Sequence, residues 1–318
     1  MEATLSVENT EGRPFNASYG KMMMWFFLVS DALTFAGFLG AYGLIRFKFL
    51  NSWPIADEVF THVPFTHTPM PMVYVALMTF ILIFSSVTMV LAVDAGHQMK
   101  KGKVAFYMLL TIIGGIIFLG SQAWEWKHFI KGSYGAVQLN SGEIAQFVGK
   151  DGHQVTLESF ATNTHNERVQ HTRSSGLWFV SEAAVPKLSL NQVIEGFKKN
   201  PDLSVRIQEI DKATKKKIIL SRTESTKLLA SSTQVVRGAN LKVNEYGKTL
   251  FGDFFFFITG FHGFHVLSGI LINIIILFNV LVGTYEKRGH YEMVEKSGLY
   301  WHFVDLVWVF VFTFFYLV

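Results

Sequence analysis

The sequence contains no cysteine in its 318 residues. This absence excludes disulfides, thiolate-bound copper or zinc, iron–sulfur clusters and c-type haem attachment within the chain, because each of them needs a cysteine sulfur. Charged residues are also sparse, at 16% of the total, and half of the residues are hydrophobic. This composition is typical of a membrane protein with one sizeable portion in water. The N-terminus has no cationic start followed by an apolar core, so we expect no cleavable signal peptide.

Charge is also nearly missing from five long stretches of the chain. Apolar runs lie at about 22–46, 71–93, 104–126, 250–282 and 299–318. Each is long enough to cross a hydrocarbon core of about 30 Å as a helix. The sequence therefore predicts an all-α membrane bundle of five transmembrane helices. Residues 1–126 would hold an N-terminal tail and the first three helices, and residues 249–318 the last two.

Residues 127–248 interrupt this pattern with a polar segment. It carries 18 Lys and Arg against 11 Asp and Glu, a net charge of +7. We expect a small α+β insertion outside the membrane, between the third and fourth helices. Its predicted elements are a strand at 152–160, a helix at 189–200 that starts with a capping box of Ser189 and Gln192, and a hairpin that pairs 203–211 with 217–222 through 212–214.

The short loops predict the orientation. Loops 94–103 and 283–298 carry six basic residues between them, and short basic loops stay on the cytoplasmic side of a membrane. With five spans, the N-terminus is then cytoplasmic, while the insertion 127–248 and the C-terminus are periplasmic.

Ionisable side chains within the spans are costly to bury, and they usually face the interior of a bundle. His262 and His265 share one helical face, which we therefore expect to point inward. We predict that four side chains hydrogen-bond within the bundle rather than bind a metal, either to one another or each separately to backbone and small hydroxyl groups: His262, His265, Glu125 and Asp305. The full set of candidates for buried polar groups or support of a proton path is Asp31, Glu125, His262, His265, His302 and Asp305.

Asp31 leaves two interpretations open. It is either a carboxyl that bonds to a neighbouring Ser or Thr, or a buried carboxyl that supports a proton path. Ser30, Thr34, Gly37 and Ala41 recur at helical spacing in the same span, and this stripe of small residues predicts a close contact with another helix.

Three residues near the predicted helix ends are candidates for lipid contact. Trp25, Arg46 and Trp301 would lie where lipid headgroups meet amphipathic rings. The Arg46 guanidinium can pair with a phosphate through two hydrogen bonds. An arginine at a helix end is also often a simple interface anchor, so both interpretations stay open.

Two motifs resemble a known family. The segments GFHGFHV at 260–266 and YWHFVD at 300–305 resemble the signature helices of subunit III of haem–copper oxidases, the cytochrome c oxidase family. Residues 25–42 look like the carboxylate-bearing helix of that family, and QAWE at 122–125 resembles one of its helix ends. The chain departs from the family in three ways. It has five spans where many members have seven, Asp31 stands where glutamate is usual, and the insertion is far longer.

The resemblance implies a subunit without a redox centre or cofactor of its own, and hence without catalytic residues. It implies partners in oxidase subunits I and II, which carry haem and copper, and bound structural phospholipid. The expected complex is a proton-pumping cytochrome c oxidase of aerobic respiration in a bacterial inner membrane. The chain would support assembly and proton uptake there. We expect no nucleic-acid partner.

Three alternatives remain beside this interpretation. A quinol oxidase subunit III is the nearest, because other subunits choose the electron donor. A haem protein with two histidine ligands needs them on different helices at matching depth. His262 and His265 lie roughly 12 and 17 Å from the outer surface and His302 roughly 25 Å, at 1.5 Å per residue, so the depths do not match. A transporter is the third, but the sequence shows no broken helix or inverted repeat.

The insertion is the part that the resemblance does not cover. Its basic surface faces the compartment of electron-donor proteins in the predicted orientation, and basic surfaces attract acidic partners. We expect that it docks against a neighbouring respiratory subunit or complex. An elaborated loop that covers the outer face of the oxidase itself is the alternative.

Overall fold

The computed structural model describes residues 18–64, 70–161, 188–211, 214 and 216–317. These residues form two compact units. The first, which we call the helix unit, consists of the described residues of Met1–Phe47, Ala56–Glu125 and Phe254–Val318. The second, the sheet unit, consists of those of Lys48–Ile55 and Trp126–Asp253. The N-terminal segment expected to lack a signal peptide lies mostly outside the described residues.

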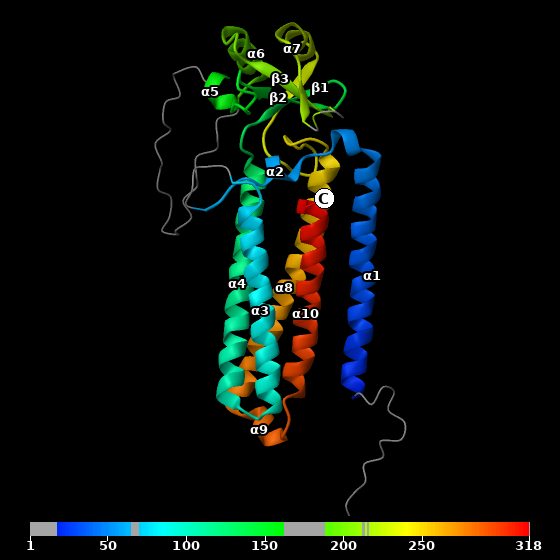
Figure 1. Ribbon diagram of the computed structural model, residues 1–318, viewed down its shortest axis with the longest axis vertical. Helices are drawn as coiled ribbons and strands as arrows, with labels where there is room; N and C mark the ends of the chain where they lie inside the picture. The colour runs from blue at the N-terminus through cyan, green and yellow to red at the C-terminus, as the bar shows by residue number, and fades with distance from the viewer. Residues whose placement is uncertain (1–17, 65–69, 162–187, 212–213, 215, 318) are drawn as a thin grey trace, which may run out of the picture. The chain divides into compact units, whose positions relative to one another are not determined.

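Five helices of the described chain are long and apolar enough to span a membrane, which agrees with the predicted number (Figure 1). The fifth begins at Glu292 rather than at 299, because Glu292 and Glu295 in its first turn suit the positive end of the helix dipole. The helices are α1 (Tyr19–Lys48), α3 (Val73–His97), α4 (Lys101–Lys131), α8 (Thr249–Val282) and α10 (Glu292–Phe312), which a π-helical turn (Thr313–Leu317) continues.

Short helical segments lie in the connections of the described chain. They are η2 (Leu50–Ser52), α2 (Ala56–Val59) and α9 (Thr284–Arg288).

Helix α1 packs through a narrow seam. Its buried residues are Leu28, Phe35, Leu39 and Tyr42, and Phe35 and Phe38 contact the ring of Phe261 in α8. The predicted stripe of small residues is exposed instead, and no atom of another residue would lie within 4 Å of a Cβ at Gly37. Among the described residues, the contact of α1 is formed by its leucine and aromatic face rather than by the stripe, because that face buries more apolar area. Packing of the stripe against another helix stays a prediction.

Small residues bring the other helices together around Trp301 of α10. A Cβ added at Gly115 of α4 would lie 2.6 Å from its ring, and one at Gly269 of α8 would lie 2.9 Å away. The indole Nε1 donates to Ser85 Oγ of α3 over 3.1 Å. One buried tryptophan thus contacts three neighbouring helices.

The sheet unit contains one antiparallel sheet of five strands in the order β4-β3-β2-β1-β5. Its apolar core includes Phe147, Val205 and Leu229. The strands are β1 (Ala136–Leu139), β2 (Ile144–Val148), β3 (Ser204–Ile210), β4 (Lys217–Ile219) and β5 (Ser232–Val236). The described helices are α5 (Leu157–Ala161), α6 (Leu190–Lys199) and α7 (Arg222–Leu229), all labelled with the sheet in Figure 1.

Two predicted elements of this unit are confirmed and one is wrong. Helix α6 begins with the capping box of Ser189 and Gln192, and β3 pairs with β4 as the predicted hairpin; its turn residues 212–213 lie outside the described residues. The strand predicted at 152–160 is absent, because only Gln154 bridges to Val148 and the helix α5 follows. Leu157 and Ala161, one helical turn apart, both enter the core, which favours the helix.

Candidate functional site

The central polar contact of the helix unit joins α1 to α8. Asp31 Oδ2 lies 3.1 Å from His265 Nε2, and the exposed fractions of the two side chains are 17% and 8%. The other ring nitrogen, Nδ1, lies 2.8 Å from the carbonyl oxygen of Phe261. The rings of Phe35 and Phe261 pack against the imidazole. The neighbours of this contact are therefore largely apolar.

The His265 imidazole lies between two oxygen groups, the Asp31 carboxyl and the Phe261 carbonyl. A neutral imidazole has one N–H and donates to one acceptor at a time. The contact therefore places a carboxyl of α1 beside an imidazole of α8, within hydrogen-bond distance.

Two hydroxyl groups hold the backbone beside this pair. Ser268 Oγ donates to the carbonyl oxygen of His265 over 2.8 Å and lies 2.7 Å from the Tyr300 hydroxyl. The Tyr300 hydroxyl also donates to the same carbonyl over 3.3 Å. These bonds connect α10 to the helix that carries His265, and they fix the position of the imidazole.

Glu125 belongs to a separate buried group. Its Oε2 accepts from Gln122 Nε2 at 3.0 Å and from the Tyr316 hydroxyl at 2.9 Å. Its Oε1 is buried and has no hydrogen-bond partner among the described residues. The carboxyl therefore connects the end of α4 to the end of α10.

The other predicted residues form two further contacts. His262 Nε2 donates to the carbonyl oxygen of Val304 over 3.0 Å, and its ring packs against Phe118 and Trp308. Ser86 Oγ lies 2.6 Å from His302 Nδ1 and also bonds to Asp305. The six side chains thus divide into four groups. Within the described chain, no three His, Asp or Glu side chains are placed to hold a metal ion.

The candidate lipid residues have different environments. Trp25 is 56% exposed on α1, and Arg46 is half-buried near the end of that helix. Trp301 is 1% exposed, so its proposed lipid contact is wrong. The reason is the earlier start of α10, which moves Trp301 from a helix end into the packed interior.

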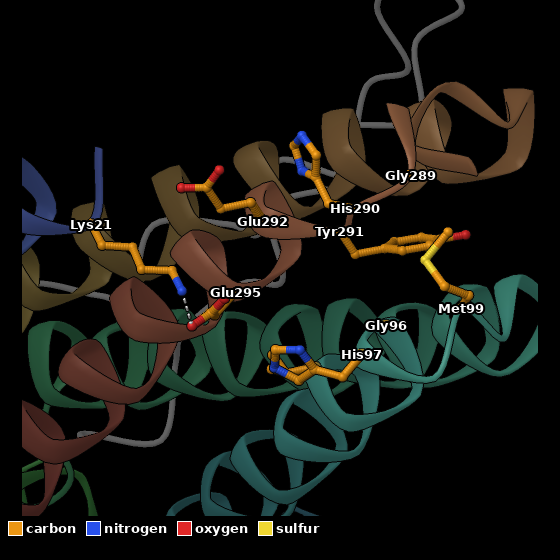
Figure 2. A pocket seen from close by; sticks show the side chains of 10 residues that line it. Lys21, Gly96, His97, Met99, Gly289, His290, Tyr291, Glu292 and Glu295 are labelled. Carbon is orange, nitrogen blue, oxygen red and sulfur yellow. Dashed lines mark ion pairs between the residues drawn. The ribbon is translucent and has the colours of Figure 1, made fainter. Parts of the chain in front are cut away.

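The sequence reasoning missed a cavity of about 350 Å³ at one end of the helix unit. Figure 2 shows Lys21 of α1 directed at Glu295 of α10, with an ion pair of 2.7 Å between them. His97 and His290 line the same cavity from the two short connections, 94–103 and 283–298. Both connections and the start of α1 therefore lie at one end of the unit. The many charged residues in these two connections were the feature of the sequence that could have indicated this cavity.

Comparison with known proteins identifies the C-terminal region. A family model described as Cytochrome c oxidase subunit III matches residues 214–318. This region is similar to cytochrome c oxidase subunit III. The subunit III match includes His262, His265, His302 and Asp305, so it confirms the resemblance carried by the two histidine motifs. Asp31 and Glu125 lie outside it.

Curated relatives named cytochrome c oxidase subunit 3 match the chain over short segments. The protein of Mycosarcoma maydis is 48% identical over 64 residues, which are 20% of this chain and 22% of that protein. The protein of Rhipicephalus sanguineus is 46% identical over 67 residues, 21% and 26% of the two chains. That of Synechocystis sp. is 43% identical over 76 residues, 23% and 32%. The chain thus spans less than a third of the length of each of these subunit 3 relatives.

Proposed function

We propose that the chain is the non-redox subunit III of a proton-pumping haem–copper terminal oxidase that reduces oxygen in aerobic respiration. The observation that carries this proposal is the subunit III match across both histidine motifs. In this role the chain binds oxidase subunits I and II, which hold the haem and copper, and it supports their assembly. The lack of cysteine supports the absence of a thiolate copper site in this chain.

Purification of the complex tests this assignment. A tagged chain should co-purify with haem-containing subunits from native membranes, and the complex should reduce oxygen with reduced cytochrome c. A complex that accepts electrons only from a quinol would instead be a quinol oxidase. A Soret band from the isolated chain would contradict the non-redox role and favour the haem protein with two histidine ligands.

The contact between the Asp31 carboxyl and the His265 imidazole supports a role in proton uptake by the catalytic subunit. The pair is separate from the groups at Glu125, His262 and Ser86, so it has no continuous path among the described residues. We propose that it supports proton delivery without being an obligatory relay.

Replacing Asp31 with asparagine tests this support role. Asp31→Asn should leave assembly intact and lower turnover far less than the roughly 100-fold that loss of a direct proton-transfer group causes. Asp94→Asn, at an exposed position near the end of α3, is the control for loss of a carboxyl. Complete loss of oxygen reduction in a normally assembled Asp31→Asn oxidase would refute the support role.

Location and orientation are also proposals. Seven basic residues lie in or beside the end of the helix unit that holds the two short connections: Lys21, Lys100, Lys101, Lys103, Lys287, Arg288 and Lys296. We propose that this end faces the cytoplasm of a bacterium and that the insertion and C-terminus are periplasmic. Because the chain has no cysteine, a single cysteine at Lys287 should resist an impermeant thiol reagent in whole cells, whereas one at Ser141 should react.

A bound structural phospholipid is the last part of the proposal. Arg46, which is half-buried near the C-terminal end of α1, is the candidate for its phosphate. Native mass spectrometry should show one phospholipid fewer in an Arg46→Ala complex. Retention of every phospholipid would leave Arg46 as an interface anchor.

A further inference from the structure

The sheet unit contains a polar cavity of about 280 Å³. At this position the pairing of β3 with β4 is irregular, and its register shifts between Arg206 and Ile210. Such irregularities are common beside binding sites. Polar side chains that line the cavity come from four parts of the chain: Asn51, Ser52, Glu143, Gln208, Glu209 and Lys248.

Gln208 is the unusual member of this set. The side chain is 6% exposed, and neither its amide nitrogen nor its amide oxygen has a hydrogen-bond partner among the described residues. The nearby buried Gln146 differs, since its amide oxygen accepts from Arg206 and Gln154 and its amide nitrogen donates to Glu245. A buried amide without partners is costly to the fold, so its presence at a cavity wall points to binding.

Because Gly247 has no side chain, it leaves space beside the amide of Gln208. Its φ of +147° suits glycine, and a Cβ there would come within 3.1 Å of Gln208 Oε1 and 3.0 Å of Pro54 Cγ. The amide atoms themselves are covered at the cavity wall. A ligand would reach them by a turn of the terminal torsion of Gln208, which has a broad energy profile in glutamine.

The other residues that line the cavity restrict the class of ligand that it can bind. Lys248 supplies a cation, the exposed Glu143 and Glu209 supply anions, and Ile144 and Ile207 supply apolar surface. The described lining residues include no aromatic ring on which a sugar or a base could stack. The volume suits only a small molecule.

We propose that this cavity binds a small zwitterion that contains an amide group, the chemistry of a dipeptide. Its amide pairs with both the donor and the acceptor of Gln208, its carboxylate faces Lys248, and its ammonium group faces Glu143 and Glu209. This site is independent of the oxidase function proposed above, because all of its residues lie in the sheet unit.

Two probes of equal length and charge test the site. Glycylglycine has the amide, and 5-aminopentanoate replaces it with two methylene groups. Titration by saturation-transfer NMR on the full chain in nanodiscs should show that glycylglycine binds at least about tenfold more tightly, as two additional hydrogen bonds imply. Gln208→Leu should abolish this preference, whereas Gln234→Leu, at an exposed position on β5, should retain it.

Lys248→Gln serves as a second variant, because the proposal places the carboxylate of the ligand at Lys248. It should weaken the binding of both probes, which share this carboxylate, and leave the preference for glycylglycine in place. Equal affinity of the two probes for the wild-type chain would overturn the proposal. A preference for glycylglycine that survives in Gln208→Leu would also overturn it.

Discussion

At the residue scale, the buried carboxylate of Glu245 connects two separate segments of the sheet unit. The side chain is 1% exposed. Its Oε1 accepts from the backbone N–H groups of Ser133, at 2.8 Å, and Tyr134, at 3.3 Å, and its Oε2 accepts from that of Gly238. Gly132 and Gly238 both have positive φ and lie in direct backbone contact, where a Cβ at either would clash. The carboxylate therefore connects the residues that follow α4 to those that follow β5.

Glu245→Gln should destabilise the sheet unit by about 1–3 kcal/mol, because the amide nitrogen would face a backbone N–H and leave it unsatisfied. Hydrogen exchange measured by mass spectrometry should become faster in peptides covering 132–148 and 232–248. Glu195→Gln, at an exposed position on α6, is the control for the lost charge. Equal exchange in the two variants would contradict the role of Glu245.

At the element scale, contact between helices depends on which glycine faces a neighbour. Gly115 and Gly120 lie on the same helix, α4. A Cβ at Gly115 would clash with Trp301 and crowd Ile270, whereas a Cβ at Gly120 would meet no atom within 4 Å. Helix propensity alone would favour alanine at both positions.

Gly115→Ala should therefore lower the thermal stability of the chain in detergent, with a cost of about 1–3 kcal/mol for overpacking. Gly120→Ala should be neutral or slightly stabilising. Near-ultraviolet circular dichroism during heating measures both. A decrease of the same size in both variants would show that the close contact with Trp301 is not responsible.

The capping box of α7 gives the sheet unit a dependence on pH. Hydrogen bonds from the Ser221 hydroxyl, at 2.6 Å, and the Ser221 N–H, at 3.1 Å, lower the pKa of Glu224 below its ordinary value of 4.5. The carboxylate stabilises the helix fully above pH 4.5, and this contribution is lost as the pH falls through the lowered pKa.

Glu224→Gln removes the titrating group but retains an acceptor oxygen. The wild-type chain should protect α7 from hydrogen exchange better than Glu224→Gln at pH 7. The difference should decrease as the pH falls below 4.5 and disappear below the lowered pKa of Glu224. A difference that stays constant over this range would mean that the charge of Glu224 does not stabilise the helix.

At the scale of the whole molecule, the contact between Gly132 and Gly238 suggests where the insertion can be removed. Ala239 N–H also donates to the carbonyl oxygen of Phe129 over 3.0 Å. Replacing residues 133–237 with two glycines would therefore join two backbone segments that already meet. The helix unit is built from other residues, so its five spans should still insert into the membrane.

This deletion tests the docking role of the insertion. Loss of association with a neighbouring respiratory complex, with oxygen reduction by the isolated oxidase unchanged, is the result expected from docking. Native gel electrophoresis of membranes in mild detergent measures the association, and oxygen uptake measures the activity. Association that persists in the deletion variant would instead favour a loop that covers the oxidase's own surface.

The sequence by itself determined the properties that depend on neighbouring residues along the chain. The five spans follow from long apolar runs, because a bilayer requires length and apolarity of each helix separately. The capping box of Ser189 and Gln192 follows from a spacing of three residues. The histidine motifs at 260–266 and 300–305 were sufficient to indicate the family, which the match over 214–318 then supported.

Only the tertiary structure decided which distant residues meet. Asp31 and His265 are separated by 234 positions, and their contact depends on the rotation of α1 about its axis, which its leucine and aromatic seam sets. The burial of Trp301 depends on Gly115 and Gly269 in two other helices. The segment 152–160 has a local strand pattern, but packing of Leu157 and Ala161 into the core favoured a helix. Burial of side chains against distant partners outweighs local preference, because the apolar area removed from water is larger than the propensity differences.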